Sequence, residues 1–184
     1  MGFDAYGAPQ FGLEDVKIAT WDATDDYGTA VDVPSVQLMG TVMQTSSAQL
    51  EGDDMITDSH AQIVGGQVRL RFGSVSVAAL EILLGISSTA SGSLQDHLKL
   101  SGGDNMPYFG ICGKMSATQG GGDLHVFLPK VKIMEDVTLA QAEYGNYLIP
   151  EVGAQAIDDE TYGVINLIEH STDTAISIPP SNIS

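Results

Sequence analysis

The stretch AQIVGGQVRLRF, residues 61–72, decides the fold class because its side chains alternate between two faces. Its second half alternates three apolar residues with three polar ones, namely Val68, Leu70 and Phe72 with Gln67, Arg69 and Arg71. A period of two is typical of a β-strand with one buried face. Residues 36–50 alternate in a similar way, so we expect two long strands here, joined by a hairpin.

Extended segments continue through most of the chain. Besides the two long strands, we expect strands at residues 16–21, 97–100, 107–115, 124–134 and 162–169, and one or two more within 139–156. Because strands greatly outnumber helices, the sequence predicts an antiparallel β-sandwich or barrel. We expect a single domain with an N-terminal arm (1–12), a β-sandwich core (13–171) and a C-terminal arm (172–184).

One flanking helix is predicted near residues 76–85. Its apolar residues recur at helical spacing, and we expect them to pack on the outside of the sandwich: Val77, Leu80, Leu83 and Leu84. Ser74 or Ser76 can cap its first turn, and Gly85 is placed to end it.

The composition is strongly acidic. Seven Lys and Arg residues stand against 24 Asp and Glu residues, which gives a formal net charge of −17, and 43% of the residues are hydrophobic. The apolar content excludes a disordered acidic tail, and the charge argues against proteins that bind phosphates or anionic membranes. The single cysteine, Cys112, cannot form an internal disulfide, which indicates synthesis in a reducing compartment.

The sequence contains no motif for catalysis, cofactor binding or metal binding. It has no GxGxxG, P-loop, HExxH, CxxC or GxSxG pattern. The four histidines have no ligand spacing, and Asp22, Asp25 and Asp26 do not match a calcium loop. We therefore expect no enzyme activity, no cofactor and no metal, and a hydrogen-bonded structural role for His125.

Two polar sets point to contacts. The acidic segment between the two long strands is longer than a tight turn requires, and we expect these residues to contact other subunits: Glu51, Gly52, Asp53, Asp54, Thr57 and Asp58. Four of the seven cations lie in predicted strands, and we expect them to pair with carboxylates within a subunit or across an interface: Arg69, Arg71, Lys130 and Lys132.

The order of several segments resembles the major tail tube proteins of long, non-contractile-tailed bacteriophages. The resemblance is carried by GLEDVKIA (12–19), YGTAVDVP (27–34), AQLEGDD (48–54) with DSHA (58–61), GDLHVFLPKVK (122–132), EYGNY (143–147) and IPE (149–151). These segments look like the family's first strand, its connector, its long second hairpin and its later strands. The resemblance covers residues 13–178.

This resemblance implies a structural virion protein, made in the bacterial cytoplasm and located in the phage tail. Six subunits would close into a ring with a continuous inner barrel. Rings would stack into a tube around a tape-measure protein and later around exiting DNA, with tail terminator and distal tail proteins at the ends. Some relatives carry an extra C-terminal immunoglobulin-like domain, which we do not expect after Ser184.

We expect the lumen of such a tube to be acidic. A basic lumen would release counterions from DNA and hold it, whereas an acidic lumen lets DNA slide without specific binding. The candidate lumen carboxylates are Glu51 and Glu143. No membrane partner is expected.

Two other classes remain open. A different ring-forming tube component, such as a tail terminator or a type VI secretion-like tube protein, would share the fold, and composition does not separate them. A small β-sandwich binding module for carbohydrate would present several aromatic side chains on one face. The chain has one tryptophan, Trp21, and 7% aromatic residues, which weighs against a binding module.

Overall fold

The computed structural model describes residues 10–23, 26–52, 55–74, 76–91, 94–117, 122–139, 144, 149–181 and 183. In this part the chain is mainly antiparallel β-structure with a single α-helix, as the alternating pattern predicts. The elements are β1 (Gln10–Thr20), β2 (Val31–Asp32), β3 (Val36–Gly52), β4 (Met55–Phe72), α1 (Val77–Leu84), β5 (Thr89–Ser91), β6 (Leu94–His97), β7 (Tyr108–Ala117), β8 (Asp123–Ile133), β9 (Glu151–Ala156) and β10 (Asn166–His170).

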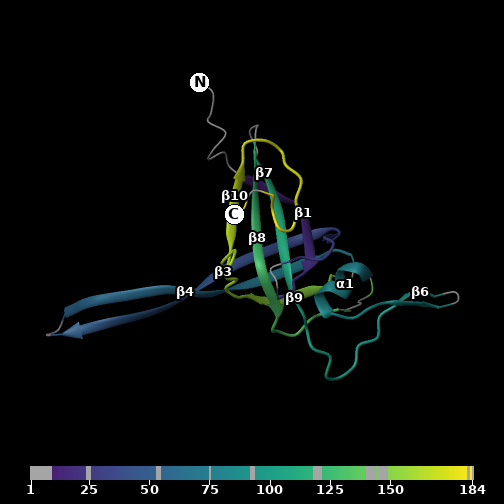
Figure 1. Ribbon diagram of the computed structural model, residues 1–184, viewed down its shortest axis with the longest axis horizontal. Helices are drawn as coiled ribbons and strands as arrows, with labels where there is room; N and C mark the ends of the chain where they lie inside the picture. Colours follow the sequence, from purple (N-terminus) through teal and green to yellow (C-terminus); the bar gives the residue numbers. More distant parts are fainter. Residues whose placement is uncertain are drawn as a thin grey trace.

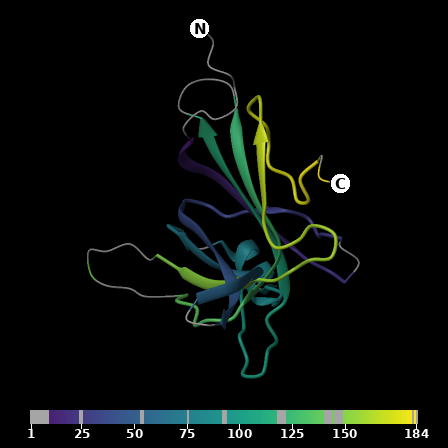
Figure 2. The same ribbon diagram turned by 90° about the vertical axis from the view of Figure 1, so that its left-hand side faces the viewer.

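Eight of the strands form one curved sheet in the order β2-β1-β7-β8-β9-β4-β3, with β10 paired to β8. Strand β8 belongs to two parts of this sheet, because residues 123–127 pair with β10 and residues 131–133 pair with β9. Figures 1 and 2 show β7, β8 and β10 running steeply across the long β3–β4 hairpin. The curvature therefore lets one sheet enclose a core, as in a sandwich.

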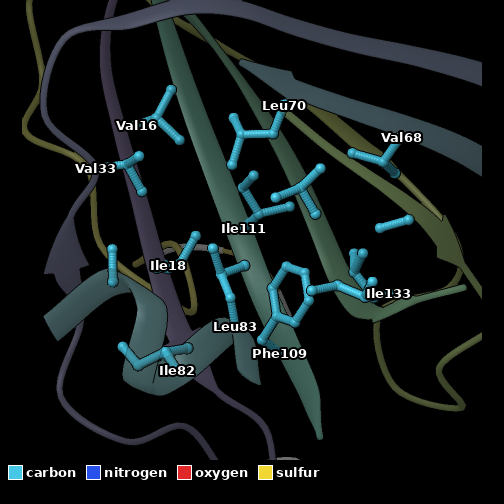
Figure 3. Packing of buried hydrophobic residues seen from close by; sticks show 14 of the residues in the cluster. Val16, Ile18, Val33, Val68, Leu70, Ile82, Leu83, Phe109, Ile111 and Ile133 are labelled. Carbon is cyan, nitrogen blue, oxygen red and sulfur yellow. The ribbon is translucent and has the colours of Figure 1, made fainter. Parts of the chain in front are cut away.

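The main core lies between α1 and the inner face of this sheet. Figure 3 shows apolar side chains from β1, β4, β7, β8 and α1 converging, among them Val16, Leu70, Leu83, Ile111 and Ile133. Burying one such side chain stabilises the fold by about 1.5–3 kcal/mol relative to leaving it in water. The inward residues of the opening stretch, which include Val68 and Phe72, join this core as predicted.

The helix has the predicted boundaries. The Oγ of Ser76 accepts a hydrogen bond from the backbone N–H of Ala79 at 3.4 Å, and Gly85 ends the helix in the left-handed conformation at φ 68°. A β-carbon at Gly85 would be strained there, which explains glycine at this position. Of the predicted stripe, Leu80, Leu83 and Leu84 are buried, whereas Val77 is partly exposed.

A smaller cluster covers the other face of β7 and β8. Cys112 and Phe127 pack there against Ile176, and Ile178 lies beside them. The described part of the predicted C-terminal arm, residues 172–184, therefore packs against its own subunit. Burial also raises the pKa of the Cys112 thiol to about 12, so this residue behaves as a small apolar side chain.

Several boundaries differ from the sequence prediction. Strand β1 begins at Gln10 inside the predicted arm, because Gly12 at φ 79° allows a bulge that keeps Phe11 paired with β7. The predicted strand at residues 97–100 lies earlier, as β6, and the strand predicted at 162–169 begins only at Asn166. The predicted polar loop between the long strands is instead strand up to Gly52 and again from Met55.

Candidate functional site

The most prominent surface feature is a two-stranded projection, here called the ribbon, formed by residues 45–52 of β3 and 55–64 of β4. Strand β4 pairs with β9 only as far as Gly66, and beyond this point its only pairing is with β3. The ladder continues to the pair Gly52 and Met55, so the ribbon extends well beyond the rest of the molecule (Figure 1). Backbone hydrogen bonds between the two strands therefore hold the ribbon in shape.

Exposed apolar side chains concentrate on this hairpin. Eight of the fourteen exposed large hydrophobic residues in the described chain lie on β3 and β4: Leu38, Val42, Met43, Leu50, Met55, Ile56, Ile63 and Val64. At the far end Leu50, Met55 and Ile56 are 64%, 69% and 58% exposed. A clustered exposed apolar surface marks an interaction site, and an isolated two-stranded hairpin is only marginally stable in water. The ribbon is thus the leading candidate for contact with another molecule.

The predicted contact residues lie at the end of the ribbon. Glu51, Thr57 and Asp58 are all exposed. Thr57 donates a hydrogen bond from Oγ1 to the carbonyl of Leu50 at 2.9 Å, which ties the two strands together. Gly52 is the last paired residue of β3. The predictions for Asp53 and Asp54 lie outside the described residues.

Besides β3, whose outer side ends the strand order, the sheet is open at β10 and at the first half of β1. Strand β10 pairs with β8 on one side, and the first half of β1 pairs with β7. No described strand pairs with the other side of β10 or with residues 10–15 of β1. Unpaired edges carry backbone N–H and C=O groups that can add a strand from another chain.

An apolar groove lies between the base of β3 and the part of the sheet that contains β10. Its volume is about 330 Å³, and its walls come from β1, β3, β7, β8 and the approach to β10: Leu13, Met39, Thr41, Met43, Gly113, Met115, Val126, Ile165 and Leu167. Met43 belongs both to this groove and to the exposed apolar set on the hairpin. The exposed apolar set of the β3–β4 hairpin therefore reaches this groove.

The four predicted ion-pair cations share the outer face of the β8–β9–β4 part of the sheet, but only one pairs with a carboxylate in the described chain. Arg71 binds Glu151 at 2.8 Å. Lys130 instead places its ammonium 3.8 Å from the ring centre of Trp21, a cation–π contact.

Lys132 and Arg69 likewise form no ion pair with a carboxylate among the described residues of the subunit. Lys132 donates to Asn105 at 3.4 Å and lies 4.9 Å from the ring centre of Tyr108. Aromatic and amide partners replace carboxylates here because Trp21 and Tyr108 reach the same face. Arg69 is exposed and has no ion pair among the described residues. Its side chain is available for an external carboxylate.

A buried polar cluster on β7 and β8 was missed by the sequence analysis. Asp123 is 1% exposed, and its Oδ2 lies 3.4 Å from Nζ of Lys114 and 3.2 Å from Nε2 of His125. The same oxygen accepts the backbone N–H of Thr174 at 2.8 Å, and Lys114 also pairs with Asp173. The cluster therefore ties the C-terminal segment to the sheet, and the predicted hydrogen-bonded role of His125 is confirmed.

The pKa values in this cluster follow from burial and pairing. Burial lowers the pKa of His125, and neighbouring His170 adds to this, although Asp123 opposes it. Burial disfavours the Asp123 carboxylate, but the Thr174 N–H, His125 and Lys114 outweigh it and hold its pKa below the usual range. The hydrogen bond to Asp173 raises the pKa of Lys114 despite burial.

The signal for this cluster was present in the sequence. The alternation in β8 places Asp123 and His125 on one face, and Lys114 is opposite His125 in the register with β7. Sequence alone does not supply that register. Nor does it supply the return of residues 173–174 to this face.

Of the predicted lumen carboxylates, Glu51 is exposed at the ribbon end and Glu143 lies outside the described residues. Within the described ranges no group of three His, Cys, Asp or Glu side chains is arranged to hold a metal ion. No helix in that part of the chain is long and apolar enough to span a bilayer. Compared with known proteins, the sequence matches no protein-family model and no curated protein.

Proposed function

We propose that this chain is a structural subunit that assembles with copies of itself into a tube, similar to the tail tube proteins of long, non-contractile-tailed bacteriophages. The ribbon carries this proposal. It exposes Leu50, Met55 and Ile56 at its far end, where no other described element of the subunit packs against the two strands. A contact with a neighbouring copy would bury this surface at about 25 cal/mol per Å² and would stabilise the ribbon itself.

The open edges at β1 and β10 support closure into a ring. The strands run in the order β10, β8, β7 and β1 with alternating directions, so β1 and β10 run in opposite directions. If β10 of one copy joined β1 of the next, the new pairing would also be antiparallel and would continue the same sheet. Such head-to-tail contacts form a ring when the rotation closes, and closure pairs the edges at β1 and β10. Six copies per ring and stacking of rings are what the resemblance implies.

The charge supports a conduit for DNA. A subunit of net charge −17 repels a passing duplex, which favours movement over retention. In this proposal the tube belongs to the virion tail, encloses a tape-measure protein and binds terminator and distal tail proteins at its ends. Glu143 remains a lumen candidate. Glu51 lies opposite exposed Ile56, which fits a subunit contact better than a channel wall.

Negative-stain electron microscopy of the purified protein tests the proposal. We expect long tubes built from stacked rings. Isolated rings without stacking would favour another ring-forming component, such as a tail terminator. Particles of single-subunit size at every concentration would contradict self-assembly and favour a small binding module.

A further inference from the structure

The outer face of the sheet around Arg69, where β3, β4 and β9 run side by side, is here called the trough and includes Leu38, Gly40 and Val42 of β3. Arg69 stands at its centre, and its direct neighbours in the register are Gly40 on β3 and Gly153 on β9. Gly40 has open space above it, because a β-carbon added there would meet no atom within 4 Å. The Arg69 side chain is therefore bordered on the β3 side by an open position.

Apolar side chains border this trough along β3. Leu38 and Val42 flank Gly40, point to the same face and are 40% and 64% exposed. On the β9 side the carboxylate of Glu135 lies over Gly153, so the open approach to Arg69 is from β3. The trough thus combines an exposed guanidinium with two exposed aliphatic side chains, which suits an acidic and apolar partner.

The ribbon end has the matching chemistry. Asp58 is directly opposite Leu50, and Met55 is opposite Gly52, two positions farther along β3. Leu50 and Gly52 share a face of β3, and a register shift between Leu50 and Glu51 brings both Asp58 and Met55 to that face of the ribbon. Leu50, Met55 and Asp58 are all exposed, and among the described residues Asp58 accepts only a local hydrogen bond, from the N–H of Ser59. One carboxylate between two apolar side chains is the complement of the trough.

We infer that the trough beside Arg69 binds the ribbon end of a second copy of this chain, with Asp58 pairing with Arg69 and with Leu50 and Met55 covering Leu38 and Val42. The inference rests on the proposed self-assembly and names the surface that receives the ribbon. The donor and acceptor surfaces differ, so the contact is head-to-tail and can propagate from copy to copy.

A charge-swap experiment tests this pairing. Arg69→Glu and Asp58→Lys are each expected to raise the protein concentration at half-assembly by about tenfold, since each places like charges together. Combining the two restores opposite charges and is expected to recover most of the loss. Lys99→Glu is the matched control, because it makes the same charge change as Arg69→Glu in the loop before β7. Assembly is measured by sedimentation, and folding by thermal unfolding.

Gly40→Val gives a second test that does not alter charge. The open space above Gly40 accepts the side chain, and valine suits a strand, so the subunit should unfold at the wild-type temperature or above. The same side chain fills the trough and is expected to weaken assembly about tenfold.

Several results would overturn the inference. It fails if Arg69→Glu and Asp58→Lys assemble like Lys99→Glu, if the double variant shows no recovery, or if Gly40→Val assembles normally. It also fails if Arg69→Glu changes only the retention of DNA fragments, which would make the trough a nucleic-acid contact. In all these cases wild-type tubes still support the proposed function, whereas a wild-type protein that never assembles contradicts both.

Discussion

Leu83 represents the residues that hold the subunit together. It is fully buried in the main core, between α1 and the sheet. We expect Leu83→Ala to lower the free energy of unfolding by about 2–5 kcal/mol, because the lost burial adds to the cost of the cavity. Val77→Ala, at the partly exposed start of the same helix, should cost less. Urea unfolding of both variants is the measurement, and equal losses would contradict the placement of the helix.

At the same scale, His125 makes stability depend on pH. Its pKa in the folded subunit lies below its ordinary value of 6.5, so the unfolded chain binds the proton more readily. The stability is therefore complete above about pH 6.5 and declines as the pH falls toward the folded pKa. Protonation of Asp123, whose folded pKa is also lowered, adds a further loss at more acidic pH.

We expect His125→Gln to flatten the decline in the free energy of unfolding as the pH falls below about 6.5, since glutamine does not titrate. The titratable groups around this site are Lys114, Asp123 and His170, together with Asp173 and Glu14, which pair with Lys114. His60→Gln, on the exposed ribbon, is the control and should leave the slope unchanged. Urea unfolding across this range, at concentrations below assembly, is the readout, and an unchanged slope in His125→Gln would refute the assignment.

At the scale of elements, local signals predicted α1 and β4 well. Ser76 and Gly85 set the helix ends through caps that involve only neighbouring residues, and the alternation in residues 67–72 requires one buried face. The end of the ribbon, residues 51–60, was not predicted as strand because neither of its faces is buried and no alternation marks it. Similarly, the bulge at Gly12 hid the start of β1, and the partners of Lys130 and Lys132 depend on strand register.

The apolar end of the ribbon gives a prediction at this scale. The triple variant Leu50→Ser, Met55→Ser and Ile56→Ser removes exposed side chains that make no core contact. We expect the subunit to fold with nearly unchanged stability, while assembly weakens strongly because the buried apolar area at the contact is lost. Leu100→Ser removes an exposed leucine elsewhere and serves as the control. A triple variant that forms normal tubes would exclude the ribbon end from the contact.

The whole molecule is distinguished by its charge of −17. We expect assembled wild-type tubes not to retain short duplex DNA. Retention should be weakest at low salt, where the repulsion between tube and DNA is least screened. Tubes of Glu143→Lys should retain DNA measurably, and added salt should release it. Glu160→Lys, at an exposed position in the turn after β9, controls for the change in total charge. Equal DNA retention by both variants would contradict the placement of Glu143 in the lumen.

The most direct test of assembly through the ribbon is sedimentation velocity of a variant with a shortened ribbon. Ser47 and Ala61 are direct partners in the ladder, so an Asn-Gly turn can join them in place of residues 48–60. We predict that the wild-type protein, whose single subunit has a mass of 19.3 kDa, forms large species as its concentration rises. The shortened variant should remain a folded monomer, with a mass lower by that of the residues removed. A wild-type protein that stays monomeric, or a shortened variant that assembles equally well, would contradict this account.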